Sequence, residues 1–169
     1  MPSENIYEYN CLMLQYQFPN WIDIHKQLIP EENLYIDSTN GGYGREGEPH
    51  ITALYGLHPE VTVDDIKQYL YPLSMFRTLL THISSFNQSE YDVLKYDIDC
   101  NMLHRINKAL TDNLPFTSDF DDYCPHMTIA YVKPGEAEQY VRQLSKPYIL
   151  TPSSYKYSYA NGDKEYFKI

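Results

Sequence analysis

Short stretches in which apolar and polar residues alternate are separated by stretches in which apolar residues recur every three or four positions. The alternating stretches predict β-strands at residues 9–18, 33–37, 49–55, 76–86, 91–99, 125–131, 148–159 and 165–169. The helical spacing, together with capping residues and terminating prolines, predicts helices at residues 21–29, 62–71, 100–114 and 135–146. An Asn161-Gly162-Asp163 turn is expected to join the last two strands into a hairpin. We therefore expect one α+β domain that spans residues 1–169.

One strand-like heptad occurs twice in the chain. Pro49-His50-Ile51-Thr52-Ala53-Leu54-Tyr55 returns as Pro125-His126-Met127-Thr128-Ile129-Ala130-Tyr131, with four of seven positions identical and the others apolar. The two histidines lie 76 positions apart, which is close to half of the 169-residue chain. This spacing predicts an internal duplication, with two pseudo-twofold-related antiparallel sheets that line a central groove and helices outside them.

In a regular strand, residues two positions apart project from the same face. His50 and Thr52 therefore share one face, as do His126 and Thr128. The same alternation directs Tyr55 and Tyr131 to the opposite face, so we expect these two tyrosines to point into the core.

The two His-Thr pairs have the chemistry that cleavage of a phosphodiester requires. An unperturbed imidazole has a pKa of about 6.5, so one histidine can accept a proton from the attacking oxygen while the other donates a proton to the leaving oxygen. Threonine hydroxyls can donate hydrogen bonds to the non-bridging phosphate oxygens. We therefore identify His50, Thr52, His126 and Thr128 as the candidate catalytic residues. No metal and no other cofactor is expected, because threonine is a poor ligand for the metals that histidine binds. A single Pro-His-x-Thr strand would more often be structural, but two copies at half-chain spacing favour catalysis.

The charge of the chain limits what the groove holds. There are 23 acidic residues against 13 basic ones, a formal net charge of −10, and no cluster of more than two neighbouring Lys or Arg residues. A protein that follows a long nucleic acid usually carries a basic stripe. We therefore expect a small phosphorylated substrate, no long nucleic acid and no membrane as partners.

The cellular setting is predicted from signals that the sequence lacks. No apolar run reaches the roughly 18 residues of a membrane span, and Met1–Asn5 has neither the basic start nor the apolar core of a signal peptide. The three cysteines, Cys11, Cys100 and Cys124, show no paired spacing, which is typical of a reduced compartment. These observations predict a cytoplasmic protein; a monomer is expected, although the sequence leaves the oligomeric state open.

The paired His-x-Thr strands resemble the signature of the two-histidine (2H) phosphoesterase superfamily, which includes RNA ligase-like cyclic phosphodiesterases and RNA 2′,3′-cyclic phosphate hydrolases. The resemblance covers nearly the whole chain in order and spacing. It implies a bilobal α+β fold in which His50, Thr52, His126 and Thr128 line the groove, without a metal.

The context of the motifs resembles a narrower, phage-encoded branch. The segments that carry this resemblance are Gly44–His50, Tyr55–His58, Glu90–Lys95 and Pro125–Gly135. The resemblance implies an anti-CBASS nuclease that degrades the cyclic di- and trinucleotide messengers of bacterial defence, in the host cytoplasm. Two alternatives stay open: an RNA 2′,3′-cyclic phosphodiesterase or ligase-like enzyme, and a non-catalytic sponge that binds cyclic nucleotides.

Recognition of the bases calls for aromatic side chains on which they can stack. Among many aromatic residues we choose Tyr16 and Phe86 as candidate substrate-binding residues. Arg45 and Lys133 we interpret as solvated surface charges rather than phosphate ligands. Whether the glycine-rich segment 41–47 acts as a lid is left open.

Overall fold

The computed structural model describes residues 7–37, 39, 42–120 and 122–169, which form two four-stranded antiparallel sheets. Sheet A has the strand order β2-β1-β7-β8, and sheet B has the order β5-β4-β3-β6. The strands are β1 (Asn10–Tyr16), β2 (His50–Leu57), β3 (Thr78–Asn87), β4 (Asp92–Asp99), β5 (His126–Val132), β6 (Arg142–Leu150), β7 (Pro152–Ser158) and β8 (Lys164–Phe167). The helices are α1 (Trp21–Leu28), α2 (Val63–Lys67) and α3 (Asn101–Asn113).

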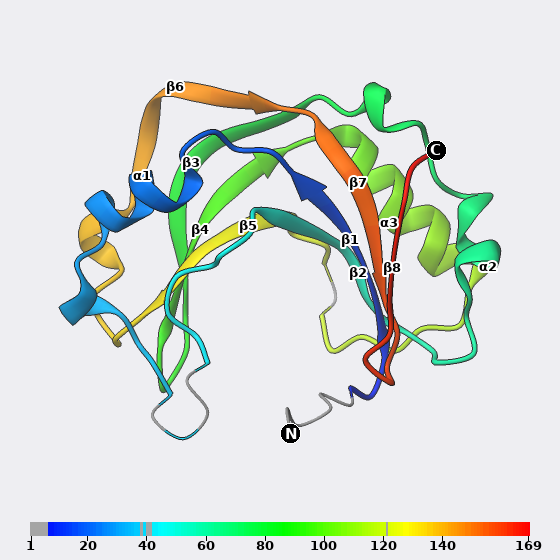
Figure 1. Ribbon diagram of the computed structural model, residues 1–169, viewed down its shortest axis with the longest axis horizontal. Helices are drawn as coiled ribbons and strands as arrows, with labels where there is room; N and C mark the ends of the chain where they lie inside the picture. The colour runs from blue at the N-terminus through cyan, green and yellow to red at the C-terminus, as the bar shows by residue number, and fades with distance from the viewer. Residues whose placement is uncertain (1–6, 38, 40–41, 121) are drawn as a thin grey trace.

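The two sheets form the arms of an arch, with the helices on its convex side (Figure 1). Strands β2 and β5, which carry the repeated heptads, are the edge strands at which the two sheets meet. Both begin near the middle of the arch, and each runs outward into its own arm (Figure 1). The expected fold, with two pseudo-twofold-related antiparallel sheets that line a central groove and helices outside, is confirmed.

A strand-helix-strand unit occurs once in each half of the chain: β1-α1-β2 and β4-α3-β5. The helix of each unit packs on the sheet of the other unit. In α1, Trp21 and His25 lie against Tyr96 of β4, and the Nε2 atom of His25 is 2.7 Å from the Tyr96 hydroxyl. In α3, Leu103, Ile106 and Leu110 are fully buried, and Asn107 donates a hydrogen bond of 2.8 Å to the Ala53 carbonyl of β2.

One of the histidines outside the heptads, His25, is part of the hydrophobic core. His25 is 1% exposed and sits in an aromatic cluster with Phe18, Trp21 and Tyr96. Burial lowers the pKa of His25 to about 4, so this imidazole is neutral near pH 7. Its role is structural.

The prediction of a helix at residues 135–146, after the second heptad, is wrong. Residues Glu138–Tyr140 form one turn of 3-10 helix, and the chain then continues as strand β6. Pro147 lies inside β6, which is tolerated because β6 is an edge strand and because residues 144–147 lie outside its paired register with β3. The expected strand at 148–159 is divided between β6 in sheet B and β7 in sheet A.

Two other elements are shorter than expected. The helix predicted at 62–71 ends at Lys67, although its capping box between Thr62 and Asp65 is present. The strand predicted at 33–37 is reduced to isolated bridges, one of them between Leu34 and Val132. No helix among the described residues is long and apolar enough to cross a membrane.

Candidate active site

The two motif histidines occupy the first position of strands β2 and β5 and are held in the same way. The Nδ1 atom of His50 is 3.0 Å from the carbonyl oxygen of Glu48, and that of His126 is 3.0 Å from the carbonyl oxygen of Cys124. A carbonyl oxygen can only accept, so each Nδ1 must carry the hydrogen. Each neutral imidazole therefore keeps its Nε2 lone pair free for proton transfer. The two rings lie close enough for the charge of His50 to affect the titration of His126.

The threonines lie on the same face as the histidines. The Thr52 hydroxyl is hydrogen-bonded to the thiol of Cys11 on the neighbouring strand. Burial raises the pKa of that thiol to about 12, so Cys11 is neutral near pH 7 and is a poor nucleophile. In sheet B, Thr128 pairs with Lys95 of β4. The structure thus brings together the four predicted catalytic residues around the junction of the sheets.

A buried charged cluster lies beside His126. Lys95 is only 7% exposed, and its Nζ donates hydrogen bonds to Asp97 Oδ1 at 2.7 Å and to Ser84 Oγ at 2.6 Å. Although burial alone would raise the pKa of Asp97, the hydrogen bonds from Lys95 and Ser84 lower it, so the cluster holds a full ion pair. The Nζ atom also lies 4.4 Å from the centroid of the Phe86 ring, a cation–π contact.

Phe86 lies at the site, as expected. Its ring stands edge-on to the His126 ring, with centroids 5.1 Å apart and an interplanar angle of 86°. The side chain is 37% exposed, so part of the ring remains available to a ligand. Its role in substrate binding stays a prediction.

Different charges surround the two histidines. Burial lowers the pKa of His126; the Cys124 carbonyl opposes this shift, and positive charge at Lys95 and His50 adds to it. His50, in contrast, has the carboxylate of Glu46 at 4.0 Å from its Nδ1 atom. Burial raises the pKa of Glu46, and positive charge on His50 works against that rise. The two histidines thus differ in their nearest charged groups: His50 faces the carboxylate of Glu46, whereas burial and Lys95 favour a neutral imidazole at His126.

The prediction for Tyr16 is wrong. Its ring is 5% exposed and its hydroxyl is 2.8 Å from the Thr78 hydroxyl, so Tyr16 belongs to the core between the sheets. Strand alternation explains the error. Tyr16 lies on the same face of β1 as Leu12 and Leu14, which are also buried, so plain alternation along the strand points its ring into the core.

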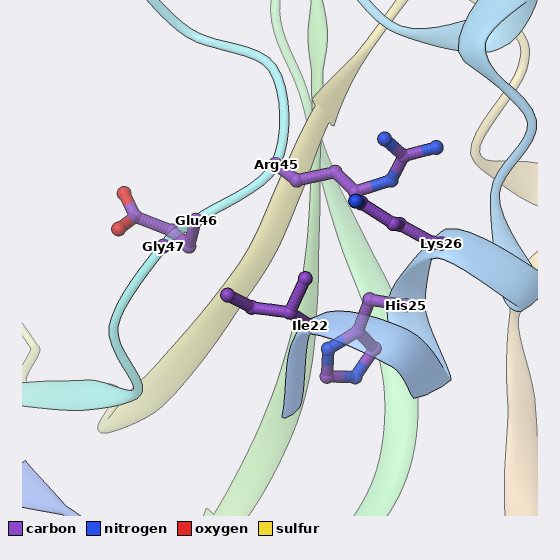
Figure 2. A pocket seen from close by; sticks show the side chains of 6 residues that line it. All are labelled: Ile22, His25, Lys26, Arg45, Glu46 and Gly47. Atoms are coloured by element: carbon purple, nitrogen blue, oxygen red, sulfur yellow. The ribbon is translucent and has the colours of Figure 1, made fainter. Parts of the chain in front are cut away.

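Arg45 is also placed differently from the sequence-based interpretation. Its guanidinium donates hydrogen bonds to Glu31 Oε1 at 2.6 Å and to the carbonyl of Ile29, and the side chain is 15% exposed. Figure 2 shows that Arg45 extends toward α1, whereas the side chain of Glu46 points the other way. Arg45 thus fixes the segment before β2 to the residues that follow α1 and is not a solvated charge. Lys133 is exposed, as expected.

The tyrosines that end the two heptads lie on the His/Thr face and not in the core. On β1, Met13 pairs with Thr52 and Cys11 pairs with Tyr55, so an extra residue of β2 is inserted between these pairs. On β4, Lys95 pairs with Thr128 and Val93 pairs with Tyr131, which places an equivalent insertion in β5.

An inserted residue of this kind, a β-bulge, shifts the alternation by one position. Since Met13 and Cys11 share a face of β1, their partners Thr52 and Tyr55 share one as well. Burial agrees, because Ala53 and Leu54 are both buried while Tyr55 is 46% exposed. The expectation that Tyr55 and Tyr131 point into the core is therefore wrong.

Sequence reasoning also missed Glu46 and the Lys95 cluster. Lys95 and Asp97 alternate with apolar residues in Asp92–Asp99, and charged residues at every second position of a buried strand are the signal that points to a functional face. Within the described ranges, no group of three His, Cys, Asp or Glu side chains is placed to hold a metal ion.

The chain was also compared with models of known protein families. Residues 28–152 match the family model described as the 2′-5′ RNA ligase superfamily, and this range is more than half of the chain. The chain belongs to the 2′-5′ RNA ligase superfamily. Members of this superfamily are phosphodiesterases or phosphoesterases, so the expected 2H phosphoesterase membership is confirmed. A search of curated protein sequences finds no significant match.

Solved structures of the yeast protein Usb1 share the fold of this chain. Usb1 of Kluyveromyces marxianus superposes with a TM-score of 0.60 at 7% identity, over 96% of this chain and 99% of that one. Usb1 of the same yeast with uridine monophosphate gives a TM-score of 0.54 at 5% identity, with the same coverage. E. coli LigT complexed with 3′-AMP is 15% identical over 96% of each chain, with a TM-score of 0.49.

Proposed function

We propose that the protein is a phosphodiesterase that cleaves the 3′–5′ bonds of cyclic di- and trinucleotide messengers. The ribose 2′-hydroxyl oxygen attacks the adjacent phosphorus, and the bond from phosphorus to the 5′-oxygen breaks. The product is a linear oligonucleotide that ends in a 2′,3′-cyclic phosphate or, after attack by water, in a 3′-phosphate. The proposed role is phage counter-defence against CBASS in the host cytoplasm.

The observation that carries this proposal is the matched pair of histidines. Both Nδ1 atoms are hydrogen-bonded to main-chain carbonyls two residues earlier, which leaves both Nε2 atoms for the substrate. Two imidazoles held in this way suit one proton acceptance and one proton donation in the same displacement. Thr52 and Thr128, on the same face, suit hydrogen bonds to the non-bridging oxygens.

The surroundings of the histidines divide these roles. His126, whose pKa is lowered by burial and by Lys95, is the general base that takes the proton from the 2′-hydroxyl. His50, next to the Glu46 carboxylate, is the general acid that protonates the leaving 5′-oxygen. When water opens the cyclic phosphate the roles reverse: His50 accepts a proton from water and His126 returns its proton to the 2′-oxygen. Both histidines then regain their starting protonation states.

The net charge of −10 supports a small substrate over a long one. The family description names an RNA ligase, which favours the alternative of an RNA 2′,3′-cyclic phosphodiesterase or ligase-like enzyme. A sponge that binds cyclic nucleotides without cleaving them would need neither of the two free Nε2 atoms.

The test is a panel of cyclic dinucleotides, cyclic trinucleotides and RNA 2′,3′-cyclic ends, incubated in EDTA and resolved by product mass. We expect linear products from at least one cyclic messenger. His50→Ala and His126→Ala should each lower kcat by about 10² to 10⁴, the usual contribution of a general acid or base. A matched control is His104→Ala, which removes an exposed histidine from α3.

The alternatives give different results in the same panel. If only RNA 2′,3′-cyclic ends react, the substrate is RNA and not a cyclic messenger. Tight binding of a cyclic nucleotide without turnover would support the sponge. Full turnover by a His50→Ala/His126→Ala double variant that remains folded would contradict every catalytic version of the proposal.

A further inference from the structure

We propose that Tyr55 and Tyr131 head two nucleobase platforms, one on each side of the His50/His126 pair, so that the preferred substrate carries a base on both sides of the scissile phosphate. This inference rests on the proposed phosphodiesterase function. It distinguishes an internal or cyclic 3′–5′ linkage from a terminal 2′,3′-cyclic phosphate, which has a base on only one side of the reacting phosphorus.

The symmetry of the fold places the two tyrosines equivalently. Each ends its heptad, and in each strand a bulge turns it onto the face of the catalytic threonine. Strands β2 and β5 start near the middle of the arch and run into opposite arms (Figure 1). Tyr55 and Tyr131 therefore lie outward from the histidines in opposite directions.

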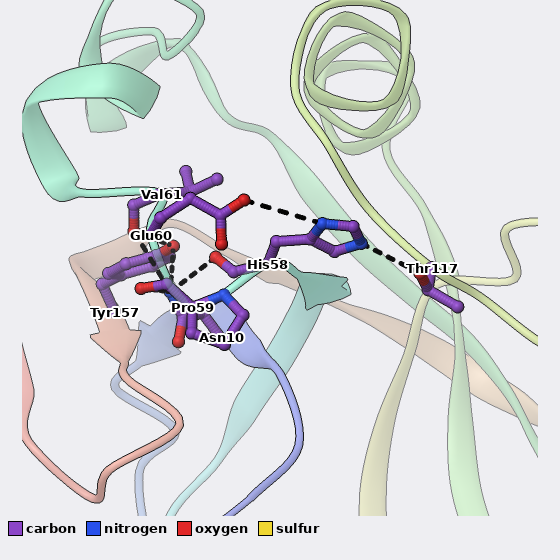
Figure 3. Close-up of polar contacts among 7 residues, drawn as sticks. All are labelled: Asn10, His58, Pro59, Glu60, Val61, Thr117 and Tyr157. Atoms are coloured by element: carbon purple, nitrogen blue, oxygen red, sulfur yellow. Dashed lines mark hydrogen bonds and ion pairs between the residues drawn. The ribbon is translucent and has the colours of Figure 1, made fainter.

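The platform in sheet A consists of Tyr55, Tyr9 and His58. The rings of Tyr9 and Tyr55 meet edge to face at 6.0 Å, and Tyr9 is stacked on His58, with ring centroids 6.0 Å apart. His58 is itself fixed at both nitrogens: Nε2 lies 2.9 Å from the Thr117 hydroxyl and Nδ1 lies 3.8 Å from Glu60 (Figure 3). The aromatic group is thus held rigid, while Tyr55 remains 46% exposed.

The platform in sheet B consists of Tyr131, Tyr43, Tyr91 and Tyr35. Tyr43 is in contact with each of the other three, with ring centroids 5.0 to 5.3 Å apart, and its side chain is hydrogen-bonded to Tyr91. Tyr43 is 46% exposed although its partners are half-buried. In sheet A the open ring is Tyr55 itself, whereas in sheet B it is Tyr43, which packs against the half-buried Tyr131.

Exposed rings of this kind suit a nucleobase for a physical reason. A base stacks on a tyrosine face with little loss of side-chain freedom, because neighbouring rings already restrict the tyrosine. Stacking accepts any base, and removal of one stacking ring weakens binding by about 5- to 150-fold. Two platforms would therefore favour a ligand that fills both over a mononucleotide.

The inference is tested by binding to the wild-type protein of d(ApA), a 2′-deoxy dinucleoside monophosphate that cannot be cleaved because it lacks the attacking hydroxyl. We expect Tyr55→Ala and Tyr131→Ala each to weaken binding of d(ApA) by about 5- to 150-fold. With 3′-dAMP as the probe, only one of the two variants should lose binding. Tyr55→Phe and Tyr131→Phe should retain binding because the ring face is kept. Tyr166→Ala, which removes an exposed tyrosine from β8 at the edge of sheet A opposite β2, is the control, and thermal unfolding reports whether each variant is folded.

The outcomes separate this inference from the function on which it rests. Unchanged d(ApA) affinity in both folded alanine variants, or equal loss in the phenylalanine variants, would overturn the platforms even if the wild-type protein cleaves cyclic messengers. Absence of cleavage in the substrate panel would overturn the proposed function, whereas the d(ApA) titration would still report on the platforms.

Discussion

Lys95 is a single residue with a large effect on the proposed chemistry. It lies beside His126 with its ammonium group bound to Asp97 and Ser84, and its positive charge helps to keep the pKa of His126 below the ordinary value. A general base must be unprotonated to act, so the lowered pKa extends activity to more acidic pH. The corresponding neighbour of His50 is a group of the opposite charge, the carboxylate of Glu46.

Replacement of Lys95 by methionine should move the acid limb of the pH profile. The change removes a positive charge and leaves the negative Asp97, and both effects raise the pKa of His126. We expect the acid limb of kcat/KM to shift to higher pH by about one unit. Lys108→Met, which breaks an exposed ion pair with Asp112, is the control and should leave the profile in place. A limb that stays in place or moves to lower pH in folded Lys95→Met would contradict the assignment of His126 as the base.

At the scale of elements, one glycine fixes the outer end of strand β2. Gly56 has a φ of +117°, and a Cβ atom there would lie 2.1 Å from the Thr117 carbonyl oxygen. The Thr117 amide in turn donates a hydrogen bond of 2.9 Å to the Gly56 carbonyl. The segment that follows α3 can approach β2 so closely only because residue 56 lacks a side chain.

Gly56→Ala should therefore be strongly destabilising. We expect a loss of about 2–5 kcal/mol in the free energy of unfolding, from the left-handed backbone together with overpacking. Two other glycines separate these contributions. Gly135→Ala keeps the positive φ of +85° but meets no atom within 4 Å, so it should cost about 1–2 kcal/mol. Gly47→Ala meets nothing and should be close to neutral, within about 0.5 kcal/mol. Urea denaturation of the three variants measures the differences, and equal losses for Gly56→Ala and Gly135→Ala would refute the steric explanation.

The heptads also show which side-chain directions strand alternation can predict and which it cannot. His50, Thr52, His126 and Thr128 follow from strict alternation, and the structure places them as alternation predicts. Tyr55 and Tyr131 do not, because a bulge depends on pairing with a neighbouring strand and leaves no mark in the pattern of the bulged strand itself. The error at Tyr16 is of another kind, because alternation along β1 already places Tyr16 on the buried face of Leu12 and Leu14.

At the scale of the whole molecule, the half-chain spacing of the heptads predicted two sheets and their shared groove. It did not predict that α1 would cover sheet B and α3 would cover sheet A. Helical periodicity shows which face of a helix is apolar, whereas the sheet that it covers depends on contacts far apart in the sequence. The same limit applies to Glu46, which is placed next to His50 by the hydrogen bond of its amide to Ile129 of the other sheet.

The strand order has a consequence for synthesis. All four strands of sheet B lie between residues 78 and 150, but the centre of sheet A joins β1 to β7, which contains the pair Leu12 and Tyr157. The strand that carries His50 therefore belongs to a sheet that is incomplete until nearly the entire chain has left the ribosome. Non-local pairing of this kind forms late, because a long loop must close first.

We accordingly expect the half of the site around His126 to become ordered before the half around His50. In pulsed hydrogen exchange during refolding, amides of the β3–β4 pair should gain protection before those of the β1–β7 pair. Simultaneous protection of both pairs would contradict this order. If the order holds, the site is completed only when strands from both ends of the chain pair in sheet A.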